Sequence, residues 1–487
     1  MEIFTNIINK LFIFLYLFLI LIIIFKLIIK RNSVNYFLLF LLIFYILPIL
    51  GIIYYILFGE IKLGIIINNR IKYFFILTYS LIKNYKIKYN FKNINQIKKT
   101  YIYMFKLCKN IKGINSFKFN KLNLITNSKN ILKSLIIDIN MAKKKIEMIF
   151  YIWHTGGLVN KVSEALIFAA KRGVKCRLIV DYVGSLSFLK SYYFLKMKLS
   201  GIYIIKALNI NIFNFFLKRC DIRQHKKIVL IDNYISYTGS MNMIDPKFFK
   251  KKYKFGELFD IMVRMEGIIS KAISIVFSLD WKIETNENIL SKNLNFSILP
   301  FNYSSFNTIQ LIASYPDFSQ NAIHKTLLTY IYSAKKYLFI TTPYFIPTND
   351  LINAICTVSQ RGVDVRITLP YKNDSIIVKW TSNYYYDELL KSGVTIYQFH
   401  CGFIHTKSIV IDKKISFIGT LNLDIRSLLL NFEITLLIKD TNFVNNLNKI
   451  QKYYFSKSNI IEYNIWYKRP YWKKIIETIF YFLSPIL

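Results

Sequence analysis

The chain has 487 residues, of which 54% are hydrophobic and 17% aromatic, and its formal net charge is +39. This length exceeds one ordinary core, and the composition favours a membrane protein with an anionic partner, although a genome rich in A and T explains many of the lysines equally well. Five cysteines without a CxxC pair exclude a disulfide framework or a zinc site as the organising feature.

Two apolar segments open the chain. Residues 11–25 are uncharged between Lys10 and Lys26, and residues 32–59 carry no charge. Because a spanning helix needs roughly 20 apolar residues, we expect a two-helix transmembrane hairpin within residues 1–60, kinked near Pro48. A cleaved signal peptide is the alternative for the first segment. Three basic residues in the connecting loop and four on the other side hardly decide the orientation, and we favour a cytoplasmic location for the rest.

The remaining chain predicts a connector, two repeats and a tail. Residues 61–120 are rich in Lys, Asn and Tyr, typical of a basic connector near the lipid surface. Strand, helix and strand patterns at 145–153, 162–172 and 174–180 recur at 337–344, 351–361 and 363–369. Alternating strands and helices predict an α/β fold with one sandwich in each repeat, over 121–295 and 296–463. The aromatic and basic tail, 464–487, predicts an amphipathic helix at the lipid interface or a helix packed on the repeats.

One motif occurs in both repeats. His225, Lys227 and Asp232 form the pattern HxKxxxxD, and His405, Lys407 and Asp412 repeat it 180 residues later. Each copy is followed at the same distance by Gly-Ser/Thr-x-Asn, which contributes Ser240 and Asn242 in the first repeat and Thr420 and Asn422 in the second. Because His and Lys two residues apart point to one face of a strand, we expect Lys226 and Thr406 to point away.

Two such half-sites around one phosphodiester predict phosphoryl transfer without a metal or cofactor. One imidazole attacks phosphorus while the other protonates the departing oxygen, and the roles then reverse. The lysines, the Asn amides and the hydroxyls of Ser240 and Thr420 are expected to bind the phosphate oxygens. Asp260 and Glu433 open equivalent strands, and each is expected to accept a hydrogen bond from its histidine. Asp232 and Asp412 lie at hairpin turns, where structural anchoring is favoured over proton transfer.

These motifs resemble the phospholipase D superfamily and, within it, the bacterial cardiolipin synthases. The narrower resemblance rests on residues 55–60 (YILFGE), 237–246 (YTGSMNMIDP), 422–427 (NLDIRS) and 431–436 (NFEITL), and on the apolar N-terminus and the tail. It implies two phospholipase D-like repeats packed face to face and transfer of a phosphatidyl group between two phosphatidylglycerol molecules, giving cardiolipin and glycerol. It also implies that the active-site set is His225, Lys227, Asp232, His405, Lys407 and Asp412, with His225 favoured as the nucleophile.

The same resemblance implies a multi-pass protein of the bacterial inner membrane, with phosphatidylglycerol and cardiolipin as its partners. We expect no nucleic acid partner and see no sign of an obligate protein partner. Two alternatives remain open from the sequence. One is a membrane-anchored phospholipase or nuclease of the superfamily that uses water as the acceptor. The other is a non-enzymatic scaffold that binds anionic lipid.

Overall fold

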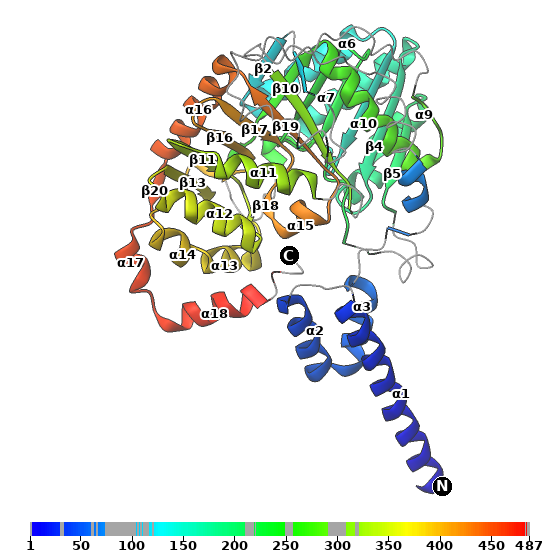
Figure 1. Ribbon diagram of the computed structural model, residues 1–487. Coiled ribbons are helices and arrows are strands. Elements are labelled where there is room, and N and C mark those ends of the chain that lie inside the picture. The colour runs from blue at the N-terminus through cyan, green and yellow to red at the C-terminus, as the bar shows by residue number, and fades with distance from the viewer. Residues whose placement is uncertain are drawn as a thin grey trace.

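The computed structural model describes residues 2–29, 34–59, 63–64, 67–73, 104, 107, 110, 116–118, 121–209, 219, 221–248, 257–290, 308–316, 321–482 and 484. Most of the predicted connector therefore lies outside the described residues. The described parts form one unit of two sheets with helices on both faces of each, from which the N-terminal helix α1 projects (Figure 1).

The two sheets share one strand order, as the sequence repeat predicts. The first runs β2-β9-β7-β6-β3-β4-β5, and the second runs β10-β19-β17-β16-β11-β13-β14 with β1 and β20 added at its edges. In strand order, the first sheet comprises Lys121–Ile125, Met262–Glu266, Ile235–Gly239, Ile228–Ile231, Lys145–Phe150, Lys175–Asp181 and Tyr203–Ala207. The second comprises Ser116–Lys118, Thr308–Ser314, Glu433–Lys439, Ile415–Gly419, Ser408–Ile411, Tyr337–Thr341, Asp364–Pro370, Thr395–Phe399 and Ser458–Ile460.

Helices separate and cover the sheets. The outer face of the first sheet carries α6 (Ser128–Met141), α7 (Gly157–Lys171), α8 (Leu186–Leu189) and α9 (Tyr192–Leu199). The outer face of the second carries α11 (Ala322–Tyr332), α12 (Asn349–Gln360), α13 (Ile376–Tyr384) and α14 (Tyr386–Lys391). Between the sheets lie α10 (Ile268–Thr285) and α16 (Thr441–Ser456), in a core that both repeats share. Because central strands are buried on both faces, runs such as 228–231 are apolar without alternation.

Short elements join the two repeats at the centre of the unit. Strand β8 (Glu257–Phe259) of the first repeat pairs in parallel with β15 (Gly402–Ile404) of the second. The second repeat adds the pair β12 (Phe345–Ile346) and β18 (Leu423–Asp424), followed by helix α15 (Ile425–Leu429). A short 3-10 helix (Pro246–Phe248) follows the first motif. The predicted face-to-face packing of two α/β repeats is confirmed.

The N-terminal region departs from the predicted pair of spanning helices. Helix α1 (Glu2–Ile29) is long and apolar enough to cross a membrane, and it is the one such helix in the described parts of the chain. The second apolar segment instead forms α2 (Val34–Ile46) and α3 (Pro48–Phe58), which at about 20 and 16 Å are too short for a hydrocarbon core of about 30 Å. They pack on each other through Phe40 and Tyr55, whose ring centroids lie 5.2 Å apart.

Pro48 explains why the second segment breaks instead of only bending. Proline lacks the N–H that a continuous helix needs, and it disfavours helical geometry at the residue before it. Leu47 accordingly leaves the helical region at φ −131°, and Pro48 occupies the first turn of α3, where its missing N–H has no cost.

The tail forms two helices, α17 (Tyr463–Tyr467) and α18 (Tyr471–Phe482). Helix α18 packs on α13, where Tyr481 stacks on Tyr384 with ring centroids 4.0 Å apart. Arg469 binds Asp387 and Glu477 in ion pairs of 2.8 and 2.7 Å and holds the turn between the two helices. The tail therefore packs on the second repeat, and its outer face is exposed.

Candidate active site

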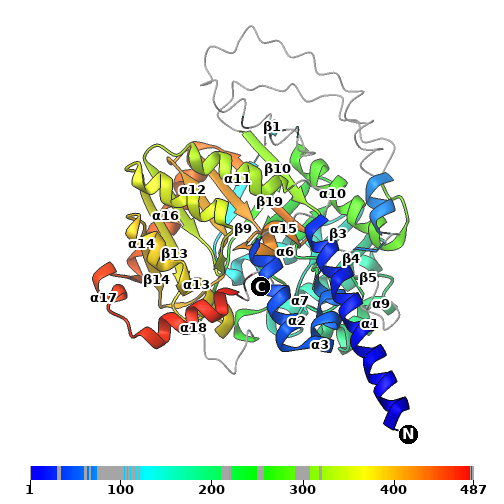
Figure 2. The same ribbon diagram turned by 60° about the horizontal axis from the view of Figure 1, so that its bottom comes forward.

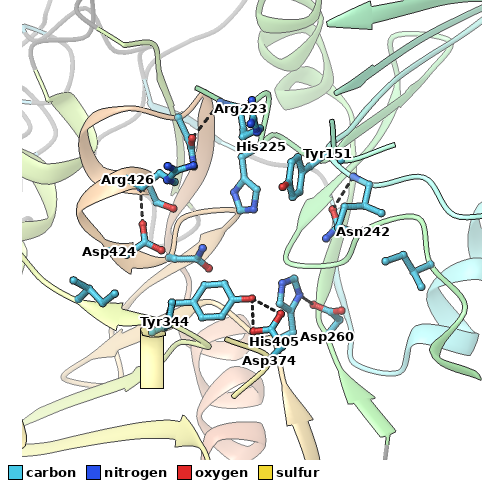
Figure 3. A pocket seen from close by; sticks show the side chains of 18 of the residues that line it. Tyr151, Arg223, His225, Asn242, Asp260, Tyr344, Asp374, His405, Asp424 and Arg426 are labelled. Carbon is cyan, nitrogen blue, oxygen red and sulfur yellow. Dashed lines mark hydrogen bonds and ion pairs between the residues drawn. The ribbon is translucent and has the colours of Figure 1, made fainter. Parts of the chain in front are cut away.

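A cavity of about 510 Å³ lies between the repeats and contains both motif histidines. Its lining comes from the two repeats together and includes His225, Asn242 and Asp260 from the first and His405, Asn422 and Arg426 from the second. Figure 3 shows the rings of His225 and His405 entering from opposite sides and facing each other. The duplicated sequence therefore builds one shared site.

Each motif is attached by its backbone to the opposite repeat. His225 and His405 lie just before β6 and β16, in extended segments outside the strands themselves. The N–H of His225 donates to the carbonyl of Phe432 at 3.0 Å, and the N–H of His405 donates to the carbonyl of Phe259 at 2.9 Å. These two bonds fix the histidines relative to each other across the repeat boundary.

The carboxylates that orient the histidines are exchanged between the repeats. The Nδ1 of His225 bonds Glu433 at 2.7 Å, and the Nδ1 of His405 bonds Asp260 at 2.8 Å. The expectation that each carboxylate serves the histidine of its own repeat is therefore wrong. The reason is the backbone attachment, because Glu433 follows Phe432 and Asp260 follows Phe259. With Nδ1 engaged, each ring presents Nε2 to the cavity.

The Gly-Ser/Thr-x-Asn segments hold these carboxylates in place. A side chain at Gly239 or Gly419 would put its Cβ 2.3 Å from the carbonyl of Ile261 or Ile434, so only glycine fits. The hydroxyl of Ser240 then donates to Asp260 at 2.6 Å, and that of Thr420 donates to Glu433. Each hydroxyl donates its one hydrogen to a carboxylate, so both residues position the carboxylates, which corrects their expected role as phosphate ligands.

Lysine and asparagine side chains complete each half-site. The Nζ of Lys227 donates to the carbonyl of His225 at 2.7 Å, and the Nζ of Lys407 donates to that of His405 at 2.8 Å. The Oδ1 of Asn242 accepts from the N–H of Ile152 at 3.3 Å, which directs its NH₂ group to the cavity. Asn422 lines the cavity with a buried Oδ1 that has no partner in the described structure.

Residues between the motif positions point away, as expected. Lys226 is fully buried, and its Nζ bonds both oxygens of Asp280 at 2.8 and 2.9 Å on the other side of the segment. The same Nζ of Lys226 lies 3.7 Å from the centroid of the Tyr315 ring. Thr406 bonds the hydroxyl of Tyr454 at 3.1 Å. On the side away from the cavity, the first half-site therefore has the buried Lys226–Asp280 ion pair, and the second has a hydrogen bond between the uncharged Thr406 and Tyr454.

Asp232 and Asp412 are backbone anchors outside the cavity. Asp232 accepts from the N–H groups of 143, 144 and 145 at 2.8–2.9 Å, and Asp412 accepts from those of 335, 336 and 337 at 2.7–3.1 Å. Each begins a hairpin turn with two consecutive residues at φ of 52–56°. Seven residues of extended chain place them roughly 20 Å from the histidines, which removes them from the set that touches a substrate.

The two half-sites differ in their proton affinities. Burial and the nearby Lys227 and Lys407 lower the pKa of His225 well below its ordinary value. Burial and Lys407 also lower the pKa of His405, but Asp260 opposes this shift. Burial acts to raise the pKa of Asp260, yet His405 and its hydrogen bonds outweigh it and leave the pKa lowered. Burial raises the pKa of Glu433 to about 7 despite Lys227.

Burial also lowers the pKa of Lys227 to about 7 and that of Lys407 to about 8. A bound anionic phosphate would oppose this shift, because a nearby negative charge stabilises the protonated form of both lysines. Within the described ranges, no three His, Cys, Asp or Glu side chains gather as a group able to hold a metal ion.

Comparison with known proteins agrees with this geometry. A family profile described as "Cardiolipin synthase, PLD-like domain" matches residues 135–254 and 327–455, one segment in each repeat. Cardiolipin synthase A of Wigglesworthia glossinidia brevipalpis is 51% identical over 95% of this chain and 93% of its own length. The chain belongs to the cardiolipin synthase family.

Other relatives extend the match to the whole chain. Cardiolipin synthase A of Citrobacter koseri is 46% identical and covers 100% of both chains. The crystal structure of phosphatidylserine synthase from Haemophilus influenzae Rd KW20 covers 79% of this chain and 100% of its own with a TM-score of 0.60. Because the phosphatidylserine synthase is only 13% identical to this chain, its similarity supports the fold alone.

Several lining residues of this cardiolipin synthase family member escaped the sequence analysis. They are Tyr151, Arg223, Tyr344, Asp374, Asp424 and Arg426. Asp424 and Arg426 do not recur in the first repeat, where Ile244 and Pro246 stand 180 residues earlier, so the repeated motif does not include them. The segment NLDIRS did contain both residues, and the alternation of Asp and Arg beside a motif asparagine was the available signal.

Proposed function

We propose that this chain is a membrane phosphatidyltransferase that makes cardiolipin and glycerol from two phosphatidylglycerol molecules through a phosphohistidine intermediate. The observation that carries this proposal is the single cavity in which His225 and His405 face each other, with Lys227 and Lys407 buried beside them. Membership in the cardiolipin synthase family supports the choice of substrate.

The reaction has two steps with exchanged proton roles. The Nε2 of His225 attacks phosphorus, the bond from phosphorus to the glycerol headgroup breaks, and His405 gives its proton to the departing oxygen. A headgroup hydroxyl of the second phosphatidylglycerol then attacks phosphorus, His405 takes the hydroxyl proton, and the nitrogen–phosphorus bond breaks. Lys227, Lys407 and the two Asn amides stabilise the charge that spreads over the non-bridging oxygens.

The electrostatic difference between the half-sites supports His225 as the nucleophile. A nucleophile must be neutral when it attacks, and the lowered pKa of His225 keeps it so. The acid must hold a proton at first, and ionised Asp260 favours the protonated form of His405. The exchange of carboxylates means that each histidine depends on the repeat that supplies its partner.

We also propose that α1 crosses the bacterial inner membrane once and that the catalytic unit lies on the cytoplasmic side. Because α2 and α3 pack on each other on either side of the break at Pro48, we place the basic residues at the end of α1 and after it on the same side as the catalytic unit. These are Lys26, Lys30, Arg31, Lys62, Arg70 and Lys72, against Lys10 on the other side. Such an excess of basic residues marks the cytoplasmic side. Reporter fusions at both ends test this arrangement.

We keep the division into 1–60, 61–120, 121–295, 296–463 and 464–487 as a proposal. It is supported by the elements from β2 to α10 and from β10 to α16, which give each repeat the seven strands of the shared order and one central helix, with β1 and β20 added at the edges of the second sheet.

The decisive test is the product formed by the purified chain in detergent with phosphatidylglycerol alone. We expect cardiolipin and free glycerol in equal amounts, and His225→Ala should abolish both while lipid binding is retained. Phosphatidic acid as the main product would instead identify a hydrolase. Full transfer activity in His225→Ala would reject the mechanism.

A further inference from the structure

Two exposed apolar helix faces lie near the cavity, one in the first repeat and one on the tail helix that packs on the second repeat. On α9, Tyr192, Leu195 and Leu199 recur at helical spacing and are 70%, 57% and 88% exposed. On α18, a second stripe is similarly exposed and consists of Tyr471, Trp472, Ile475, Ile479 and Phe482. We call these residues the α9 face and the α18 face. Large apolar side chains gathered at this exposure mark a surface with a partner.

Both faces are tied to the cavity by short stretches of chain. Gly184, which lines the cavity, lies between β4 and the helices that lead to the α9 face. Val378, which also lines it, lies on α13, the helix on which α18 packs. Helix α9 follows β4 as α13 follows the equivalent strand β13, so the duplicated fold brings both faces to the same end of the unit.

That end is also where the N-terminal helices emerge. Figure 2 shows the hairpin of α2 and α3 between α18 on one side and α9 on the other, with α1 projecting beyond them. Helix α6, which carries exposed Ile137 and Met141, lies at the top of Figure 1, away from the projecting α1. If α1 crosses a membrane, both faces therefore lie closer to that membrane than α6 does.

The charges on both faces fit an anionic lipid surface. Helix α9 has no acidic residue, and the Nζ of Lys196 lies 5.7 Å from the centroid of the Tyr192 ring. On α18, Lys473 and Lys474 lie 5.5 and 5.3 Å from the rings of Trp472 and Tyr471, and Glu477 is buried against Arg469. Aromatic residues with lysines beside them are typical of helices at the membrane interface.

We propose that the α9 and α18 faces are two interfacial contacts that seat the cavity on the bilayer, so that phospholipid enters from the membrane on both sides of the pseudo-two-fold site. This inference extends the proposed function to how its substrate arrives. Two contacts and α1 together fix the tilt of the catalytic unit, which one spanning helix alone leaves undetermined.

Depth measurements on the full chain in vesicles of phosphatidylglycerol and phosphatidylethanolamine test the contacts directly. A polarity-sensitive dye is attached to Leu199→Cys or Ile475→Cys, with Met141→Cys as the matched control and the unsubstituted chain as the blank for native thiols such as exposed Cys401. We expect lipid-borne nitroxide to quench the dye at 199 and 475 and to leave it unchanged at 141. Equal quenching at all three positions, or none at 199 and 475, would overturn the proposal and point to a protein partner for these faces.

Activity separates this inference from the proposed function. In Leu195→Glu/Leu199→Glu and in Trp472→Glu/Ile475→Glu, we expect kcat/KM on vesicles to fall roughly tenfold, the factor that 1.4 kcal/mol represents. The rate with dispersed short-chain phosphatidylglycerol should stay unchanged, as should both rates in Ile137→Glu/Met141→Glu. Loss of the short-chain rate as well would show that the helices support the fold and would refute the docking role. A wild-type chain without transfer activity on either substrate would instead refute the proposed function.

Discussion

The exchange of carboxylates predicts that Glu433→Gln impairs the histidine of the other repeat. Glu433 is fully buried and bonds the Nδ1 of His225 at 2.7 Å, and glutamine keeps its shape while removing its charge. A hydrogen bond to a charged group contributes about 1.5–3 kcal/mol, and 1.36 kcal/mol corresponds to tenfold in rate. Formation of the phosphohistidine should therefore slow roughly 10- to 150-fold.

Rapid quenching with radiolabelled phosphatidylglycerol, followed by peptide mapping, measures this step. Glu433→Gln should show slow labelling of His225, whereas the matched variant Asp260→Asn should slow breakdown of the intermediate, because His405 is then a weaker base in place. Because Asp260 also favours the protonated form of His405, Asp260→Asn should slow labelling of His225 as well, but the label that forms on His225 should persist. Label on His405 in either variant, or an effect of Glu433→Gln confined to breakdown, would refute the assignment of the nucleophile.

Three further outcomes follow from the site. The plot of kcat/KM against pH should be bell-shaped with a narrow optimum near 7, falling on the acid side as Glu433 gains a proton and on the alkaline side as Lys227 (pKa about 7) and then Lys407 (pKa about 8) lose theirs, and a flat profile across this range would contradict these roles. Asp232→Ala removes three hydrogen bonds that backbone N–H groups donate to the carboxylate, and it should lower the thermal midpoint by several degrees while kcat of the folded fraction stays near wild type; loss of kcat without loss of stability would show that Asp232 takes part in the chemistry. Lys226→Met breaks a buried ion pair and should cost about 3–5 kcal/mol, most of it recovered by adding Asp280→Leu, and thermal unfolding of the single and double variants measures both.

Local patterns in the sequence predicted most of the repeat fold. Strand composition and the glycines at 173 and 362 placed β3, α7, β4 and their counterparts within a few residues. The spacing of His and Lys correctly separated the cavity side from the side occupied by Lys226. These features depend on neighbours along the chain, so a single sequence contains the information.

What the sequence failed to predict depends on contacts between distant segments. The pairing of His225 with Glu433 arises from the backbone bond between His225 and Phe432, 207 residues apart in the numbering, and no spacing rule reports it. Ser240 and Thr420 were assigned to the phosphate because their burial against the carboxylates was not visible. At the N-terminus, counting apolar residues gave a second span, whereas one proline divided the segment into two shorter helices.

Strand β1 has a consequence for the order in which the protein is completed during synthesis. It precedes the first repeat in the chain, yet its partner β10 belongs to the second sheet and lies about 190 residues downstream. At a translation rate of roughly 5–20 residues per second, this strand waits some 10–40 s before its partner leaves the ribosome. By then α1 has already emerged, so this edge of the second sheet closes on a nascent chain that is already tethered at the bilayer.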